Sequence, residues 1–373
     1  MKELKLNVIE VNQPIGTLYL ASINASILCN AVTINRRRES MFGIQRSPVR
    51  KRLSEITSYC SDPDATFPTS IIVSVNESEM GVAVSYDSEK HEMTIQYDKA
   101  IGEVIDGQHR ILGIKEAENR QDFDLPVIFL LNATNEQKSY VFSIINSKQV
   151  QVKSSLIFDL FGVAEGRSPQ KTVHTIARAL NYSKNSPFYH RLKMLGTKED
   201  GFEDATLSQG TFAKRLLALI SRTPEQDQID IKRGKKLSAD SRCPFRDYFI
   251  QDRDDVIKAI VENCFVALSH VFPDEWDNPH EYILWKSTGY NAIIDSLKDI
   301  YDFGKVIQRL DVELFKEIFD ELYVVLDEGM TIDDVKMSNV KLTSMYFSSG
   351  EKETAKLKTY ILEALERVKH RYE

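Results

Sequence analysis

Short β-branched and alternating runs fill much of the first 150 residues. Ser70–Val75 is strongly β-branched and Leu125–Leu131 is continuously apolar, so each run predicts a buried strand. Residues 81–86 and 91–97 alternate apolar and polar positions on either side of Asp87–Lys90. This alternation around a short polar segment is typical of a β-hairpin.

Two other segments of this region have helical signals. Ser47–Cys60 begins with Ser and Pro, a pair that often opens a helix. Thr134 and Gln137 have the spacing of a capping box, which predicts a helix that runs to about Ser147. Strands and helices in this mixed order predict an α+β domain over residues 1–152.

The pattern changes after Lys153. From there on the apolar residues keep helical spacing almost throughout, and no run matches the earlier strand-like segments in strength. We therefore predict an all-helical second domain over residues 153–373. Loops are expected near Asn181–Phe188, Gly196–Leu207 and Pro224–Pro244.

The segment Gly102–Ala117, GEVIDGQHRILGIKEA, places five polar residues between a short β-branched run and an apolar-periodic run. We expect a strand that ends near Ile105 and a helix that begins within Asp106–Arg110. At such a turn, backbone N–H groups without intrahelical partners and the positive end of the helix dipole can meet an anion. The turn is therefore the first candidate site.

Composition limits the class of protein. A chain of 373 residues with 42% hydrophobic and 28% charged residues is typical of a soluble globular protein with two packed units. No apolar run approaches the roughly 18–20 residues that span a bilayer, and the N-terminal residues lack the apolar core of a signal peptide. The four cysteines lie far apart, without metal-ligand spacing. We expect a cytoplasmic protein with reduced thiols, no metal site and no membrane partner.

Charge is unevenly distributed along the chain. The formal net charge of −7 excludes a uniformly basic nucleic-acid-binding protein. Residues 36–52 nevertheless carry seven basic side chains and one acid, and residues 232–236 form a smaller basic cluster. Such patches can contact phosphates within an acidic protein, which makes Arg36, Arg37 and Arg38 candidate DNA contacts. The alternative is a solvated basic surface.

The row Asp106–Arg110, DGQHR, resembles the signature of the DGQHR-domain family, which occurs with bacterial DNA-modification and phage-defence systems. One branch of that family, DndB, is linked to DNA phosphorothioation, and another accompanies insertion of 7-deazaguanine into DNA. The row is also similar to the phosphate-binding turn of the ParB and sulfiredoxin superfamily. Residues 44–59, 142–160 and 207–216 resemble further segments of the family. The resemblance implies a ParB/sulfiredoxin-like α+β core followed by a helical half.

Each residue of the row has a candidate role. Gly107 lets a phosphate approach the backbone, and Gln108 belongs to the same phosphate-binding set. Sulfiredoxin has a cysteine where this chain has Gln108, so its redox reaction is excluded at that position. Arg110 offers a planar fork to phosphate oxygens. The candidate catalytic residues are His109, as a hydrogen-bond donor or proton carrier, and Asp106, as a ligand for Mg²⁺, a ribose hydroxyl or a water. The structural alternative is that Asp106 caps the helix and Arg110 pairs with an acid inside the fold.

Residues outside the row complete the candidate site. Arg46 precedes a predicted helix and can reach the same phosphate. Asn146 and Gln149 lie where a later helix ends, and we expect both to contact nucleotide or DNA; for Asn146 the alternative is an ordinary helix-ending role. Ser208 and Gln209 either open a DNA-reading helix or simply place a serine at an N-cap.

Three functional classes follow. The first is a protein of a DNA-modification or defence system that binds nucleotide or DNA phosphate, with weak NTPase activity on a nucleoside triphosphate with Mg²⁺. The second is a non-enzymatic, DNA-binding transcriptional regulator of a DndB-like phosphorothioation system. The third is a ParB-like nuclease, which needs clustered carboxylates for metal ions, whereas only Asp106 and Glu103 lie near the motif. DNA and other proteins of the same operon are the expected partners, and a homo-oligomer is compatible with each class.

Overall fold

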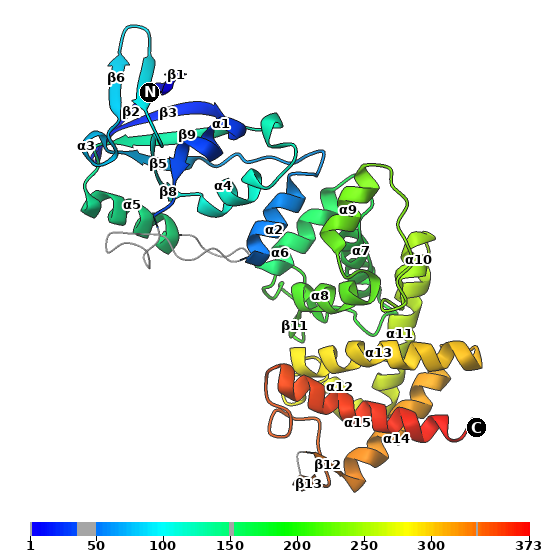
Figure 1. Ribbon diagram of the computed structural model, residues 1–373. Helices are drawn as coiled ribbons and strands as arrows, with labels where there is room; N and C mark the ends of the chain where they lie inside the picture. Colours follow the sequence, from blue (N-terminus) through cyan, green and yellow to red (C-terminus); the bar gives the residue numbers. More distant parts are fainter. Residues whose placement is uncertain (1, 36–49, 149–152, 333–334) are drawn as a thin grey trace. The chain divides into compact units, whose positions relative to one another are not determined.

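The computed structural model describes residues 2–35, 50–148, 153–332 and 335–373. Contacts within the chain divide it into two compact units, residues 1–151 and 152–373 (Figure 1). The first unit mixes strands and helices and the second is mainly helical, which confirms the predicted α+β class. Among the described residues, no helix combines the length and the apolar character needed to cross a bilayer.

A six-stranded mixed sheet forms the centre of the described N-terminal unit. Its strand order is β2-β3-β9-β5-β8-β4, with parallel pairing between β5 and β9 and between β4 and β8. The central strands β5, β9 and β8 are largely buried because their residues are mostly β-branched or otherwise apolar. The strands are β2 (Ile9–Gln13), β3 (Gly16–Asn24), β9 (Asp124–Leu131), β5 (Ile71–Val75), β8 (Gly102–Asp106) and β4 (Val32–Thr33).

The predicted hairpin is confirmed. Strands β6 (Ala83–Asp87) and β7 (Glu92–Tyr97) pair in antiparallel fashion, and β1 (Lys2–Asn7) adds to the outer side of β7. Met93 and Ile95 are fully buried while the residues between them are more exposed, as a half-buried strand requires.

Helices cover the six-stranded sheet through two apolar clusters. The larger cluster packs strand residues against α1 (Ala25–Ala31) and α4 (Gln108–Lys115), and Ile56 of α2 (Arg50–Tyr59) joins its margin. Helices α2 and α4 approach closely because Gly113 has no side chain: a Cβ there would lie 2.6 Å from Cγ2 of Ile56. Two further short helices of this unit are α3 (Glu77–Met80) and the 3-10 turn Arg120–Asp122.

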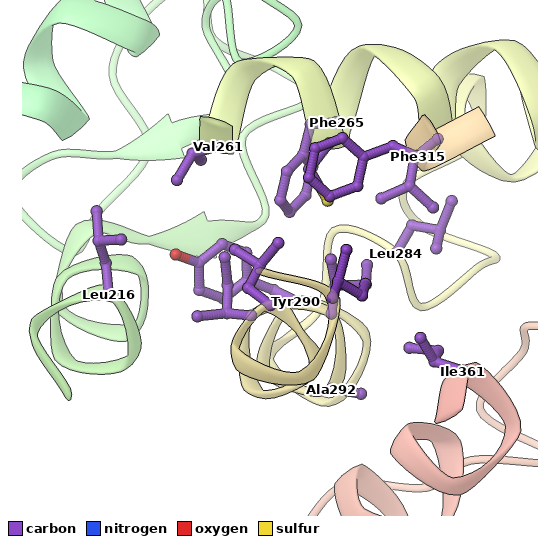
Figure 2. Packing of buried hydrophobic residues seen from close by; sticks show 14 of the residues in the cluster. Leu216, Val261, Phe265, Leu284, Tyr290, Ala292, Phe315 and Ile361 are labelled. Carbon is purple, nitrogen blue, oxygen red and sulfur yellow. The ribbon is translucent and has the colours of Figure 1, made fainter. Parts of the chain in front are cut away.

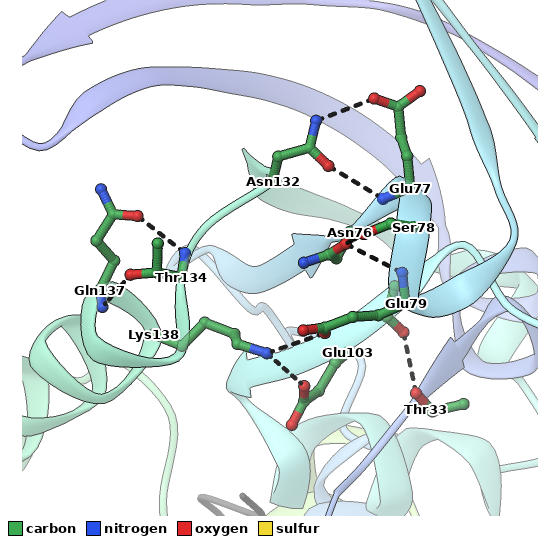
Figure 3. Close-up of polar contacts among 11 residues, drawn as sticks. Thr33, Asn76, Glu77, Ser78, Glu79, Glu103, Asn132, Thr134, Gln137 and Lys138 are labelled. Carbon is green, nitrogen blue, oxygen red and sulfur yellow. Dashed lines mark hydrogen bonds and ion pairs between the residues drawn. The ribbon is translucent and has the colours of Figure 1, made fainter.

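The helix α5 (Asn135–Lys148) begins at the predicted capping box. Oε1 of Gln137 accepts a hydrogen bond from the Thr134 N–H at 2.9 Å, and the Gln137 N–H donates to Oγ1 of Thr134 at 3.2 Å (Figure 3). Val141 and Phe142 of this helix pack on the smaller apolar cluster around Ile105 and Leu130. The capping signal therefore placed the start of the helix correctly.

The C-terminal unit is built mainly from ten α-helices in its described part. They are α6 (Ser154–Leu160), α7 (Pro169–Tyr182), α8 (Gln209–Ile220), α9 (Pro224–Lys232), α10 (Arg246–Ile250), α11 (Asp254–Val271), α12 (Pro273–Asp277), α13 (Ser287–Ile307), α14 (Val312–Glu328) and α15 (Glu351–Lys369).

Two expectations for this unit were wrong. It is not all-helical, because the two-residue strands β10 (Leu192–Lys193) and β11 (Leu207–Ser208) pair, and so do the three-residue strands β12 (Met330–Ile332) and β13 (Val335–Met337). The predicted loop at 224–244 begins with the helix α9, which starts at a proline in the first helical turn. Strands of two or three residues are too short to show an alternation of apolar and polar positions. Helix α9 has only a weak amphipathic pattern, so its sequence resembles a polar loop.

Large aromatic side chains fill the core of the C-terminal unit (Figure 2). Tyr290 and Phe265 are buried side by side with ring centroids 5.8 Å apart. The buried hydroxyl of Tyr290 donates to the carbonyl of Phe212 at 3.0 Å, so its polar atom is satisfied. Aromatic burial of this kind accounts for the long apolar faces of α8, α11 and α13.

A buried lysine joins α5 to the sheet and to α3 (Figure 3). The Lys138 ammonium lies 3.5 Å from a carboxylate oxygen of Glu103 on β8 and 3.5 Å from one of Glu79 on α3. Lys138 and Glu103 are both buried, and Glu79 is half exposed. Removing one partner of a buried ion pair leaves the other charge without compensation, which is costlier than removing both.

We predict that Lys138→Met lowers the free energy of unfolding by about 3–5 kcal/mol, because Glu103 stays buried without its cation. The double variant Lys138→Met, Glu103→Leu should recover much of that loss. Urea denaturation followed by circular dichroism measures both values. Lys90→Met, which removes an exposed ion pair with Asp87, is the control and should change stability by less than about 1 kcal/mol. Additive effects of the two core substitutions would contradict the pairing.

Candidate functional site

The DGQHR row forms the predicted strand-to-helix turn. Strand β8 ends at Asp106, Gly107 is the N-cap residue with φ of 98°, and α4 begins at Gln108. The left-handed backbone suits glycine, and a Cβ at Gly107 would lie 2.4 Å from Cδ1 of Ile71. Both features explain why glycine stands at this position.

The start of α4 has free backbone donors. The first hydrogen bond of the helix runs from the Ile111 N–H to the Gly107 carbonyl at 3.0 Å. The N–H groups of Gln108, His109 and Arg110 precede it and have no intrahelical acceptor. The N-cap receives no side-chain hydrogen bond within the described part of the chain, so the alternative in which Asp106 caps the helix is wrong.

A β-bulge lies directly before the turn. Between β5 and β8, Ile72 pairs with Asp106 but Val73 pairs with Val104, so Ile105 is the extra residue. A bulge bends its strand and redirects the side chains beside it. Here it brings the Asp106 carboxylate to the side chain of Arg110, one turn further along α4.

Arg110 is bound inside the fold. Its Nη1 donates to Oγ1 of Thr69 at 2.8 Å and to the Thr69 carbonyl, and its Nη2 donates to the Ser70 carbonyl at 3.1 Å and to Oδ2 of Asp106 at 2.9 Å. All four Nη–H donors are therefore used. The Nη groups that we expected to meet phosphate oxygens are thus bound to the chain, and the alternative in which Arg110 pairs with an acid inside the fold is what the structure contains.

The surroundings of His109 favour its neutral form. Burial lowers the pKa of His109 below its ordinary value, the nearby Arg52 on α2 lowers it further, and Asp106 partly offsets both effects. Its Nε2 atom is buried and has no hydrogen-bond partner among the described residues. A buried polar atom without a partner is unfavourable, so a ligand that forms a hydrogen bond with Nε2 of His109 would gain free energy of binding.

Gln108 also has a buried polar atom that no described residue satisfies. Its side chain is only 7% exposed, and its Oε1 atom has no partner in the residues that the structure describes. Buried side-chain amides normally satisfy both of their polar ends. Two consecutive residues at one helix N-terminus thus carry unpaired buried polar atoms, which is uncommon in a site with only a structural role.

The remaining predicted residues are distributed as follows. Arg36, Arg37, Arg38, Arg46 and Gln149 lie outside the described residues. Asn146 lies within the last turn of α5, two residues before its end at Lys148. The contacts predicted for these six residues therefore stay predictions.

Of the two alternatives for Ser208, the N-cap is the one that the structure contains. The Ser208 hydroxyl caps α8 by accepting from the Thr211 N–H at 3.1 Å. Gln209 is fully buried; its amide Nε2 donates to the carbonyls of Ser155 and Met194, and its Oε1 lies 3.1 Å from Nδ1 of His174. Gln209 thus ties α8 to the core and is inaccessible to a nucleic acid.

Sequence reasoning missed the acceptors of Arg110. Thr69 and Ser70 precede β5 and lie some forty positions before the arginine. Two of the three contacts are to backbone carbonyls, which every residue has, and the third is to the hydroxyl of Thr69, so no sequence signal marks them. Lys138 was also missed, because an isolated lysine on a helix is usually exposed.

The turn and the sheet define a mixed α/β protein whose best-formed candidate site is an uncapped helix start with buried polar side chains. Comparison with known protein families then shows that the DndB family, described as DNA-sulfur modification-associated, matches residues 6–190. Over these residues the chain is DndB-like. The match includes the whole candidate turn and continues to α7 of the C-terminal unit. No curated protein and no solved structure matches the chain.

We predict that Arg110→Ala lowers the free energy of unfolding by about 2–3 kcal/mol without any ligand, because Asp106 and the Thr69 and Ser70 carbonyls lose a charged donor. Arg110→Lys should recover only part of this, since an ammonium reaches fewer of these acceptors. Chemical denaturation measures the series. Full stability of Arg110→Ala would show that the side chain is free for another partner.

Proposed function

We propose that the protein acts in a DNA phosphorothioation system and that the turn Asp106–Arg110 binds a phosphate of DNA. Two observations support the proposal. Residues 6–190 match a DNA-sulfur modification-associated family, and three N–H groups without an intrahelical acceptor begin α4 inside the matched region. Helix N-termini favour anions through these donors and through the helix dipole.

The observation that carries the proposal is the pair of unsatisfied polar atoms at the start of α4. His109 belongs to the first turn of α4, and a phosphate oxygen would supply the missing partner of its Nε2 atom. Gln108 supplies a second polar contact: in the flipped orientation its side-chain amide donates to a phosphate oxygen. The phosphate oxygens of a DNA backbone would thus satisfy both residues.

Asp106 and Arg110 take a different role from the one first expected. Their ion pair and the contacts to Thr69 and Ser70 hold the turn in shape, which makes both of them positioning residues. Glu103, the other acid near the motif, binds Lys138. Since both acids already hold a cation of the chain, the arrangement favours binding over metal-assisted hydrolysis.

The favoured function is therefore non-enzymatic binding of DNA, as in a regulator of the modification system. The competing function is binding and slow hydrolysis of a nucleoside triphosphate with Mg²⁺, for which Asp106 would have to release Arg110. Fluorescence anisotropy with labelled duplex DNA, with and without phosphorothioate, and with a labelled nucleoside triphosphate plus Mg²⁺ separates the two. Tight binding of the triphosphate alone would support the competing function.

We predict that DNA affinity rises as the pH falls from about 8 to 5.5. The lowered pKa keeps His109 neutral at pH 8, and a bound phosphate stabilises its protonated form, so binding takes up a proton. The gain should be roughly tenfold, which corresponds to about one unit of pKa change. DNA phosphodiesters do not titrate in this range, so the effect reports on the protein.

His109→Gln should remove this pH dependence and leave residual binding. The control is His91→Asn, which changes an exposed histidine of the same unit at a position with φ of 53° that asparagine tolerates. It should keep the wild-type pH profile. Parallel pH profiles for wild type and His109→Gln would show that His109 does not face the phosphate.

A further inference from the structure

A polar cavity of about 510 Å³ lies in the C-terminal unit, where the first turns of α13 and α15 meet α8. Figure 1 shows α13 and α15 starting on the same side of this unit, next to α8. Its lining is rich in hydroxyl, amide and charged groups: Thr211, Lys214, Arg215, Ser287, Thr288, Asn291, Glu351 and Thr354. This volume is typical of a site for a small molecule.

Two helix N-termini open into the cavity. Helix α13 has 21 residues and begins after Lys286, and α15 has 19 residues and begins after Gly350. Neither N-cap residue provides a side-chain hydrogen bond within the described part of the chain. Ser287 and Thr288 from the first turn of α13 line the cavity together with Glu351 from the first turn of α15. The positive ends of two long helices therefore face the same space.

Asn291 gives an independent indication of a ligand. It lines the cavity from the second turn of α13 and is only 9% exposed. Its Oδ1 atom is buried and has no hydrogen-bond partner among the residues that the structure describes. An acceptor buried without a donor is unfavourable, and a hydroxyl group on a bound molecule would satisfy it.

Two cations of α8 complete the site. Lys214 is exposed and forms no ion pair with any described residue. Arg215 lies between Asp295, at 3.2 Å, and the carboxylate of Glu351. The Glu351 side chain is 79% exposed, so moving it into solvent costs little. A carboxylate of the chain thus occupies the position that an anionic ligand would take on Arg215.

We propose that this cavity binds a small phosphate monoester that also carries a hydroxyl group. The phosphate lies between Lys214, Arg215 and the free N–H groups at the start of α13, where it displaces Glu351. The hydroxyl donates to Oδ1 of Asn291. The site uses none of the residues of the DGQHR turn, so it stands or falls independently of the DNA-binding proposal.

Thermal unfolding in the presence of inorganic phosphate or ribose 5-phosphate tests the site. The chain has two tryptophans, Trp276 and Trp285, and both belong to the C-terminal unit, so tryptophan fluorescence follows the unfolding of this unit alone. A ligand that binds the folded state must raise its Tm, by about 3–6 °C at ten times Kd. Ionic strength is held constant with sodium chloride.

Single-residue variants test whether the rise in Tm comes from binding in this cavity. Lys214→Met should lose most of the rise in Tm, whereas Lys236→Met, at an exposed lysine outside the cavity, should keep it and thereby corrects for general salt effects. Glu351→Gln should strengthen the response, because the competing carboxylate is gone. Asn291→Ala should reduce the excess response to ribose 5-phosphate over inorganic phosphate.

Equal responses of wild type, Lys214→Met and Lys236→Met to both probes would overturn the proposal. A weaker response of Glu351→Gln would also contradict it, because the proposed ligand replaces that carboxylate on Arg215.

Discussion

The guanidinium of Arg110 holds the candidate site together, because one side chain joins the β8–α4 turn to a segment about forty positions earlier in the sequence. It binds the Asp106 carboxylate at the end of β8 and the carbonyls of Thr69 and Ser70 before β5. These contacts fix the angle at which α4 leaves the sheet. The β-bulge at Ile105 and the positive φ of Gly107 allow the chain to turn sharply at this point. The contacts of Arg110 then hold the turn in this conformation.

The residues next to Arg110 have polar groups that this arrangement leaves without hydrogen-bond partners among the described residues. With Arg110 committed to the fold, the start of α4 keeps its free N–H groups, and His109 and Gln108 keep buried polar atoms that no described residue satisfies. The left-handed N-cap at Gly107 excludes a serine or aspartate cap without strain, so no side chain at that position satisfies these N–H groups. The unsatisfied groups are better explained by a ligand that binds there, and phosphate suits both the donors and the dipole. The cavity at the starts of α13 and α15 also combines helix N-termini with a buried polar atom, Oδ1 of Asn291, that no described residue satisfies.

Much of the N-terminal unit was predictable from local sequence. The β-branched run of β5, the alternation of β6 and β7, and the Thr134–Gln137 capping box each depend on residues close together in the chain. The contacts of Arg110 with the segment before β5 were not predictable, because Thr69 and Ser70 lie some forty residues away and mainly offer backbone carbonyls. The two alternatives for Gln209 could not be separated from the sequence for a related reason: only the packed fold shows that a polar residue at a helix start is buried against Ser155 and Met194.

The central claim is that the free N–H groups at the start of α4 bind a phosphate of DNA. Amide hydrogen exchange of the full-length protein, with and without duplex DNA, measures these groups directly. The account predicts that the amides of Gln108, His109 and Arg110 become protected when DNA binds, while amides of the hairpin β6–β7 do not change. Saturating DNA that leaves the exchange of residues 108–110 unchanged would contradict it.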